Sequence, residues 1–410
     1  MKKRIGSGMA LSVLLLTPVL FFCCFSAAFL SCGARAEDWT MAEIIEEIDL
    51  PEPGETLLAT DVDYYTPNEI NGHQCNHAIC FWNLKMGCMD EEAIWQVLTQ
   101  PVTVLKGAQR EQIRARKEPD ASCEEYTGVI TCASQAVHVL DRGEEWTLVE
   151  AYSSCEEGSI VKVWALPFQG YVKTSLLEEK EVDQTYGLVI DKLQQRLYVF
   201  KEGKLFATLL CSTGYPRADT PFAETPAGEF LMVSWTGGFW AGSLYCDMGM
   251  RINSGILIHE VPCTIEKDEK TGAEIRDYKR CERYLGEKAS HGCIRVQREK
   301  TPEGVGIKWL WDNLHRSPAT KVIIWDEIGR ELGYPDDELI LYYNPSGGKN
   351  YHSQATCSQV LSKFEPMTPF RYGDLEEKPF SKLGRCPACA PQLRREEIDT
   401  VNAKNTRVGK

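Results

Sequence analysis

The sequence predicts a mainly β protein that is built from several domains. Short segments rich in β-branched and aromatic residues recur through the middle of the chain, and turn-forming residues separate them. Apolar residues at helical spacing are limited to a few short stretches. With 410 residues, the chain is long enough for two to four domains.

The N-terminus has the pattern of a secretory signal peptide, which we assign to residues 1–36. A basic start, Met-Lys-Lys-Arg, precedes an apolar stretch over residues 9–30, and a small-x-small cleavage site ends at Ala36. The apolar stretch is also long enough to remain as a membrane anchor, since about 20 residues suffice to span a bilayer. We expect an exported protein, in the cell envelope or secreted, that acts at the outer face of the cytoplasmic membrane.

Charge and cysteine content narrow the function further. The net charge of −14 argues against a nucleic-acid partner, because such a surface needs a basic face. The chain has 17 cysteines, and an exported protein with so many of them is expected to form some disulfides.

Residues 37–99 are interpreted as a linker followed by a Cys/His/aromatic segment. The first part is acidic and helix-prone, and could be a docking helix instead. The second part contains His73, Cys75, His77, Cys80, Trp82 and Cys88. Zinc binding is conceivable here, but the spacings match no zinc motif, so disulfides or buried thiols are favoured.

Residues 100–178 predict a small β domain. Strands are expected at 101–105, 128–130, 136–140, 146–150 and 170–173. The last of these resembles the final strand of bacterial SH3 domains, which often bind cell wall. The resemblance implies an SH3-like small barrel with the cell wall as partner, and a structural spacer is the alternative. His138 alternates with apolar neighbours and is expected to face solvent.

Residues 183–326 predict a second β-rich domain with a minor helix. Strands are expected at 187–191, 196–200, 205–211, 255–259 and 321–325, and residues 225–230 are expected to form a turn that leads into another strand. A tight turn at 201–204 makes the second and third a hairpin. Residues 305–314 predict the helix, with Trp309 and Trp311 in its apolar stripe.

The stretch Ser290, His291, Gly292, Cys293 carries the candidate chemistry. A thiol attacks as a thiolate, and a nearby imidazole such as His259 can take its proton. Glycine beside the nucleophile lets backbone approach a carbonyl, and neighbouring N–H groups can stabilise an oxyanion. On residue types alone, a structural cysteine remains the more common outcome.

The combination of motifs is far more specific. Ser-His-Gly-Cys-hydrophobic-Arg, preceded by a strand that ends in Ile-His-Glu and by Thr-Pro-x-Gly-x-Phe, resembles the YkuD-type L,D-transpeptidase family. The resemblance covers residues 183–326 and implies a β-rich L,D-transpeptidase catalytic domain. It implies that Cys293 is the nucleophile, His259 the general base, and the Glu260 backbone carbonyl the group that orients His259. Ser290, His291, Gly292 and Arg295 match positions that shape the oxyanion and substrate site.

The same resemblance implies the reaction. The cysteine would attack a peptidoglycan stem peptide, release its terminal D-amino acid and pass the acyl group to an amine of another stem, without metal or cofactor. With water as acceptor, the enzyme would be an L,D-carboxypeptidase or amidase. A wall-binding protein with a decayed catalytic domain is disfavoured by the intact His259 and Cys293. A papain-like protease is disfavoured because its cysteine precedes its histidine, and the caspase signature is absent.

Two cysteine-bearing regions remain. The segment between His259 and Ser290 is longer than is usual in the family, and we expect it to form a lid with a Cys263–Cys281 disulfide at its base. Residues 327–410 form a small C-terminal extension with His352, Cys357, and a CxxC at Cys386 and Cys389. These could form a four-ligand zinc site or one disulfide plus a free thiol. The disulfide is slightly favoured, so no metal is assigned.

Overall fold

The computed structural model describes residues 79–154, 166–215, 223–357 and 359–406. Within them the protein is mainly β with few helices, as the sequence predicts. The predicted signal peptide and most of the linker, including His73, Cys75 and His77, lie outside these residues. In the described part of the chain, no helix is both long and apolar enough to cross a bilayer.

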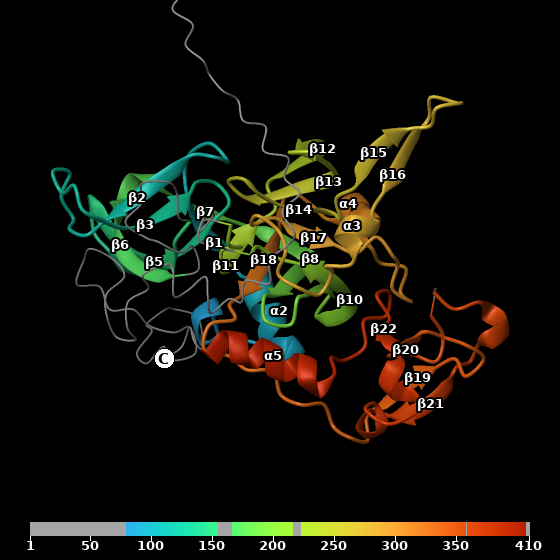
Figure 1. Cartoon of the computed structure of the whole chain (residues 1–410). Coiled ribbons are helices and arrows are strands. Elements are labelled where there is room, and N and C mark those ends of the chain that lie inside the picture. Colours follow the sequence, from blue (N-terminus) through green and yellow to red (C-terminus); the bar gives the residue numbers. More distant parts are fainter. Residues whose placement is uncertain (1–78, 155–165, 216–222, 358, 407–410) are drawn as a thin grey trace, which may run out of the picture. The chain divides into compact units, whose positions relative to one another are not determined.

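A seven-stranded antiparallel sheet forms the first β region, in the order β3-β2-β6-β5-β4-β1-β7 (Figure 1). Its strands are β1 (Val102–Leu105), β2 (Gln112–Arg116), β3 (Tyr126–Thr131), β4 (Ala136–Arg142), β5 (Trp146–Tyr152), β6 (Pro167–Lys173) and β7 (Leu177–Lys180), with the short helix η2 (Thr174–Leu176). Phe168 and Val172 alternate along β6 and pack into a core with Ile130 and Val149. The strands predicted here are present, and the likeness to SH3 domains stays a prediction.

A nine-stranded sheet forms the second β region, in the order β11-β18-β8-β9-β10-β17-β14-β13-β12. Its strands are β8 (Val182–Asp191), β9 (Arg196–Lys201), β10 (Lys204–Ser212), β11 (Gly228–Leu231), β12 (Ser234–Ala241), β13 (Leu244–Asn253), β14 (Ile256–Glu260), β17 (Ile294–Val296) and β18 (Ala319–Trp325). The pairs β8–β18 and β14–β17 are parallel, and the other pairs are antiparallel.

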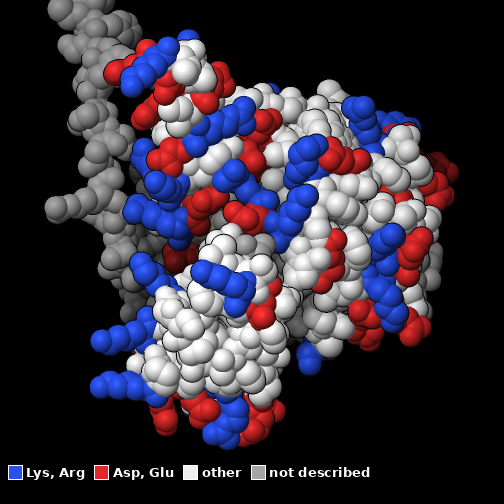
Figure 2. Space-filling view, turned by 90° about the vertical axis from the view of Figure 1, so that its right-hand side faces the viewer, with Lys and Arg blue, Asp and Glu red and all other residues white. Residues whose placement is uncertain are grey.

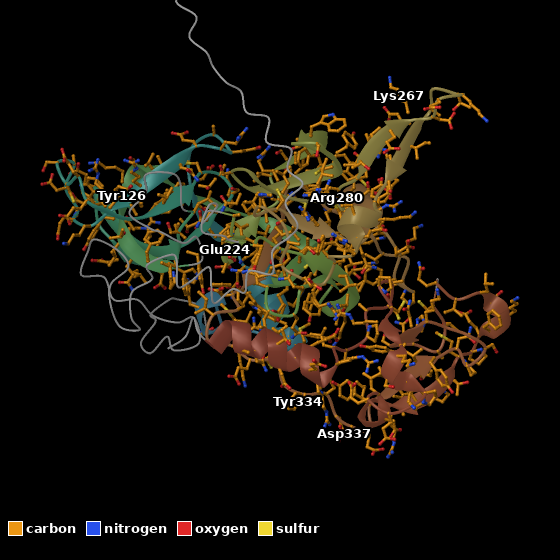
Figure 3. All side chains as sticks on the ribbon, viewed as in Figure 1. Tyr126, Glu224, Lys267, Arg280, Tyr334 and Asp337 are labelled. Atoms are coloured by element: carbon orange, nitrogen blue, oxygen red, sulfur yellow. The ribbon has the colours of Figure 1, made fainter. Side chains whose placement is uncertain are left out.

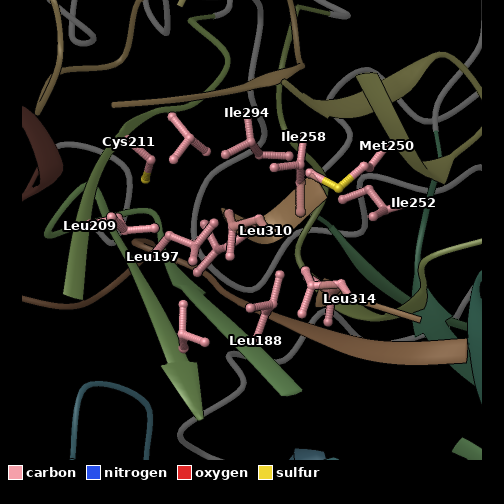
Figure 4. Close-up of a cluster of buried hydrophobic side chains, with 14 of the residues drawn as sticks. Leu188, Leu197, Leu209, Cys211, Met250, Ile252, Ile258, Ile294, Leu310 and Leu314 are labelled. Carbon is pink, nitrogen blue, oxygen red and sulfur yellow. The ribbon is translucent and has the colours of Figure 1, made fainter. Parts of the chain in front are cut away.

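Both faces of the central strands are buried. On one face Leu188, Leu197 and Ile258 pack against the helix α4 (Ile307–Asn313), as Figure 4 shows for part of this core. On the other face Val189 and Phe200 pack against the helix α2 (Glu91–Thr99) and the short helix η1 (Phe81–Asn83). Burial on both faces explains why these strands are continuous apolar runs without polar alternation.

Helix α2 shows how the segment before the first sheet joins this core. Asp90 caps its N-terminus, because its carboxylate accepts a hydrogen bond from the Ala93 amide at 3.1 Å. Ile94 and Leu98 point into the core, and Lys321 Nζ donates to the Val97 carbonyl at the C-terminal end at 2.7 Å. Residues near the end of the predicted linker segment therefore belong to the second domain's core.

His138 contradicts the prediction that it faces solvent. Its Nε2 lies 3.2 Å from a carboxylate oxygen of Glu229 on β11, and its side chain is only 14% exposed. Burial alone would raise the pKa of Glu229, but Lys321 and His138 lower it to about 2. The prediction was wrong because alternation along β4 does not reveal that β11 packs against its outer face.

Two smaller elements complete the described chain. The long segment after β14 forms a hairpin of β15 (Thr264–Lys267) and β16 (Glu274–Asp277), which projects from the sheet, and the helix α3 (Lys279–Glu282). The C-terminal extension has a four-stranded sheet in the order β21-β19-β20-β22. Its elements are β19 (Ile340–Tyr343), β20 (Asn350–His352), η3 (Ser362–Phe364), β21 (Thr368–Arg371), η4 (Tyr372–Asp374), η5 (Phe380–Lys382), β22 (Gly384–Arg385) and α5 (Arg395–Thr406).

Basic and acidic side chains are interspersed over the face shown in Figure 2. No continuous basic patch appears on that face. This distribution agrees with the net charge of −14 and gives no support for nucleic-acid binding there.

Candidate active site

His259 and Cys293 come together because β14 and β17 are parallel neighbours. The register pairs Ile258 with Ile294 and His259 with Arg295, and Cys293 directly precedes β17. Successive strand side chains point to opposite faces. Ile258 and Ile294 enter the core, so the imidazole and the thiol emerge together on the other face.

The backbone fixes the tautomer of His259. Nδ1 lies 2.6 Å from the carbonyl oxygen of Glu260, which can only accept, so Nδ1 carries the proton. The residue is 2% exposed, and the edge of the Phe239 ring packs on the imidazole at 5.4 Å between ring centroids. Burial lowers the pKa of His259 to about 4, although the hydrogen bond to Glu260 opposes this effect. The imidazole is therefore neutral at neutral pH and presents the lone pair of Nε2.

Burial and hydrogen bonding both favour the neutral form of the Cys293 thiol. Sγ lies 3.6 Å from the Gly255 carbonyl oxygen, to which it donates. Burial raises the pKa of Cys293, while the backbone of Leu257 and the guanidinium groups of Arg295 and Arg251 act in the opposite direction. A neutral thiol beside a neutral imidazole requires proton transfer during attack instead of a preformed ion pair.

The loop before the nucleophile is held by local hydrogen bonds. The Gly292 amide donates to Ser290 Oγ at 3.1 Å, and Ser290 Oγ in turn donates to the Cys293 carbonyl. Thr225 Oγ1 donates to the Gly292 carbonyl at 2.7 Å and accepts from the Gly214 amide at 2.8 Å. Thr225 thus ties the nucleophile loop to the loop that precedes β11.

Gly292 is required by its conformation and by its surroundings. Its φ is +113°, a region that residues with a side chain rarely adopt. A Cβ at this position would lie 2.6 Å from Cδ1 of Ile256 and 3.2 Å from the carbonyl oxygen of Glu224. From the sequence, we expected this glycine to let the backbone approach a substrate closely. The structure gives a second reason for glycine, because a side chain here would be too close to Ile256 and Glu224.

Residues 185–324 match the family model of YkuD, the L,D-transpeptidase catalytic domain. This part of the chain is therefore similar to L,D-transpeptidase catalytic domains. The match lies inside the predicted limits of 183–326.

Three known proteins are among those similar to this chain. "Putative L,D-transpeptidase YciB" of Bacillus subtilis (strain 168) is 27% identical over 194 residues, which are 45% of this chain and 89% of that protein. A solved L,D-transpeptidase (residues 123–326) from Xylanimonas cellulosilytica DSM 15894 is 19% identical, with 34% of this chain and 60% of that chain covered and a TM-score of 0.23. An L,D-transpeptidase from Mycobacterium smegmatis is 13% identical over 47% of this chain and all of that chain, with a TM-score of 0.25. TM-scores this low carry no weight, so the assignment depends on the family model and the Bacillus protein.

The remaining predicted residues lie near Cys293 in the sequence or on the same face of the sheet. Arg295 is half-buried on the same face as His259 and Cys293, and burial lowers its pKa. The side chain of His291 is exposed, next to the thiol in sequence. Thr225 begins the Thr-Pro-x-Gly-x-Phe motif, but the sequence did not show its hydrogen bond to the Gly292 carbonyl. Sequence analysis missed Arg251 and Phe239, because they come from other strands, β13 and β12.

The long segment after β14 braces the base. Tyr278, which follows β16, donates from its hydroxyl to Oε2 of Glu260 at 3.0 Å. Arg298 approaches the other oxygen of Glu260 at 3.4 Å and lies 3.5 Å above the Tyr278 ring. The Glu260 side chain is therefore held by Tyr278 and Arg298, while its backbone carbonyl accepts the hydrogen bond from His259.

The predicted disulfide in this segment is wrong, since Cys263 and Cys281 are both buried free thiols. Cys263 pairs with Tyr245 of β13 in an isolated antiparallel bridge, whereas Cys281 lies on α3. Burial raises the pKa of both thiols, which keeps them protonated. The base of the segment is therefore held by packing and by the Tyr278–Glu260 hydrogen bond.

A buried ion cluster supports the nucleophile loop from behind. Lys192 Nζ is fully buried and lies 2.6 Å from Glu224, 3.1 Å from Asp326 and 2.9 Å from Glu327. Lys288, shortly before Ser290, contacts both Glu224 and Glu327. Figure 3 labels Glu224, which directly precedes Thr225. Burial raises the pKa of Asp326, whereas the two lysines outweigh burial and lower the pKa of Glu327.

Proposed function

We propose that the protein is a peptidoglycan L,D-transpeptidase that cross-links stem peptides through an acyl-enzyme on Cys293, in cell-wall biogenesis. The observation that carries the proposal is the state of His259. Its proton is fixed on Nδ1 by the Glu260 carbonyl, so Nε2 can accept the thiol proton from the neighbouring strand. L,D-transpeptidases act on peptidoglycan stem peptides, and their family consists of extracytoplasmic cell-wall enzymes.

In the first step, Sγ of Cys293 attacks the carbonyl carbon of the donor stem peptide while Nε2 of His259 takes the thiol proton. The tetrahedral oxyanion collapses to a thioester, and the imidazolium gives its proton to the leaving amine of the terminal D-amino acid. The Glu260 carbonyl stabilises the imidazolium during this step, as a carboxylate does in serine hydrolases.

In the second step, an amine of another stem peptide attacks the thioester. His259 takes a proton from this amine and returns it to Sγ as the new amide forms. The first step starts from a neutral thiol and a neutral imidazole, and the second step restores both, in agreement with the raised pKa of Cys293 and the lowered pKa of His259.

The oxyanion would be held by the loop around the nucleophile. The Gly292 amide already donates to Ser290 Oγ. We therefore propose the Cys293 amide as the backbone donor to the oxyanion. We propose that Arg295 and the exposed His291 contact the substrate. Removing a single oxyanion donor typically lowers turnover by about 10²–10³-fold.

The proposal also places the protein outside the cytoplasmic membrane, with residues 1–36 as its signal. We further propose that the β domain over residues 100–178 is SH3-like and binds cell wall. Sedimentation with purified peptidoglycan sacculi would test this, with Cys293→Ala chain as input so that turnover does not interfere. A chain that stays in the supernatant would contradict the binding role.

Product analysis tests the activity and its acceptor. Purified protein would be incubated with a disaccharide–tetrapeptide muropeptide and the products separated by chromatography. We expect dimers linked between third residues, and no product from Cys293→Ala. Cys88→Ala removes an exposed thiol as the matched control and should be fully active. Tripeptide without dimer would identify the L,D-carboxypeptidase instead, because the same thioester then reacts with water.

A further inference from the structure

We propose that His352, Cys357, Cys386 and Cys389 bind one structural zinc ion in the C-terminal extension. The sequence left this possibility beside a disulfide and slightly favoured the disulfide. The structure reverses that preference, because the four ligand atoms lie within 4.8 Å of one another. The inference concerns a site that plays no part in the acyl-transfer chemistry.

Strand pairing brings the ligands together from distant parts of the extension. β20 and β22 are parallel, with Asn350 beside Gly384 and Tyr351 beside Arg385. The next residues in this register are His352 and Cys386. Cys389 then returns through the tight turn of the CxxC, in which the Ala390 amide donates to the Cys386 carbonyl at 3.0 Å.

The distances fit a tetrahedral metal better than a disulfide. With Zn–S near 2.3 Å and Zn–N near 2.0 Å, a tetrahedron has S···S edges of roughly 3.8 Å and S···N edges of roughly 3.5 Å. Sγ of Cys357 lies 3.7 Å from Sγ of Cys386. Sγ of Cys389 lies 3.5 Å from Nδ1 of His352. A disulfide would require about 2.05 Å between two sulfur atoms and would leave the other two ligands unused.

The surroundings are those of a closed site. His352 is 4% exposed, Cys357 7% and Cys386 0%, and Met367 and Ala388 pack against the cysteines. The Ser353 amide donates to Sγ of Cys389 at 3.4 Å, which is the kind of hydrogen bond that orients a metal ligand. Four protein ligands leave no open position for water, so the metal would be structural and not catalytic. Binding would release the thiol protons of the cysteines.

The site also fixes the extension to the transpeptidase domain. Carbonyl groups of the CxxC turn accept hydrogen bonds from two side chains of that domain. Arg196 donates to Ala390 at 3.2 Å and Gln297 donates to Ala388 at 3.4 Å. Gln297 directly follows β17, the strand that begins after Cys293. The same turn lines a cavity of about 510 Å³ between β9, β10 and the extension.

The experiment uses the full chain, purified with Zn²⁺ and without chelator. Elemental analysis should give one zinc per chain, and Co²⁺ substitution should give the visible absorption of a tetrahedral thiolate site. Cys386→Ser should lose most of the metal, while Cys88→Ser, an exposed thiol elsewhere, should keep it. Unchanged zinc in Cys386→Ser would overturn the assignment.

Two further measurements guard against simple misfolding of that variant. His352→Cys offers four thiolates and should still bind one zinc; a well-folded variant without zinc would contradict the site. Thiol labelling separates metal from disulfide. If zinc is bound, the thiols should become reactive when a chelator is added; these are Cys357, Cys386 and Cys389. Thiols that become reactive only after a reductant is added would indicate a disulfide and exclude zinc. Thiols that react without either reagent would also exclude zinc.

Discussion

Gly292→Ala tests whether the conformation of the nucleophile loop matters to both stability and turnover. A residue with a side chain at this φ costs about 1–3 kcal/mol in backbone strain. The new Cβ would also lie 2.6 Å from Cδ1 of Ile256, so that side chain must move within a packed core. Overpacking of this kind typically costs a further 1–3 kcal/mol. We therefore expect the free energy of unfolding to fall by roughly 2–6 kcal/mol in total.

Gly304→Ala is the matched control. Its φ is +81°, but no heavy atom lies within 4 Å of an added Cβ. It should therefore show the backbone cost of about 1–3 kcal/mol alone. Because residue 304 lies outside the nucleophile loop, its turnover should stay close to that of the unchanged protein.

Urea unfolding followed by tryptophan fluorescence would give the stabilities, and acylation by a tetrapeptide muropeptide would give the activity. The Gly292 variant should be the less stable of the two and should also lose acylation, because the carbonyl of residue 292 would shift from Thr225. Equal destabilisation by the two substitutions, with acylation intact in both, would refute the reasoning.

Four further predictions concern the base, the thiol and the buried charges. His259→Ala should lower acylation by roughly 10²–10⁴-fold at unchanged circular dichroism, and a loss below about tenfold would contradict its role as base. The protein should lose roughly 3 kcal/mol of stability as the pH falls from about 6.5 to about 4, because His259 binds a proton in this range only when the chain is unfolded. The urea midpoint of the unchanged protein should therefore fall with pH in this range, and the midpoint of His259→Ala should lack this part of the pH dependence. Alkylation of Cys293 by iodoacetamide should accelerate only as the pH rises beyond the ordinary thiol range, whereas a rate already maximal at acidic pH would reveal a preformed thiolate. Lys192→Met should cost about 3–5 kcal/mol, because three buried carboxylates lose their shared cation. Lys308→Met, at an exposed pair with Asp312, should cost less than about 1 kcal/mol, and similar losses at the two lysines would contradict the cluster's importance.

Local patterns in the sequence were sufficient for most of the β-strands. β8, β9 and β18 are apolar runs bounded by turn residues, and the structure has a strand at each predicted place. The helix expected over residues 305–314 is α4. Cys293 and His259 could be named because the residues around each form a compact motif. The parallel pairing of β14 with β17 then puts both on the same face of the sheet.

The sequence could not reveal contacts between distant segments. Thr225 begins a motif that the sequence shows, but its hydrogen bond to the Gly292 carbonyl joins two distant loops and could not be read from that motif. Lys192 supports the nucleophile loop through partners far away along the chain, and no local pattern marks such partners. The same limitation made His138 appear solvent-facing, since Glu229 reaches it from another sheet. The Cys263–Cys281 bridge was inferred from placement along the chain, which does not determine whether two side chains face each other.

The four-residue cluster in the C-terminal extension shows the same limitation, but here the sequence missed a contact that the structure contains. Cys386 and Cys389 form a recognisable CxxC, but the sequence does not show which histidine or further cysteine joins them. The pairing of β20 with β22 supplies His352, and the following loop supplies Cys357. Geometry therefore favours a four-ligand site where the pattern alone favoured a disulfide.

The central claim, that Cys293 carries the acyl group, is tested most directly by intact-protein mass spectrometry. The protein would be mixed with a tetrapeptide muropeptide, quenched in acid and digested to locate the adduct. We expect an added mass equal to the donor without its terminal D-amino acid, located on Cys293 and removed when an acceptor amine is supplied before quenching. Cross-linked product formed without any adduct on Cys293, or an adduct on another cysteine that turns over equally fast, would contradict the account.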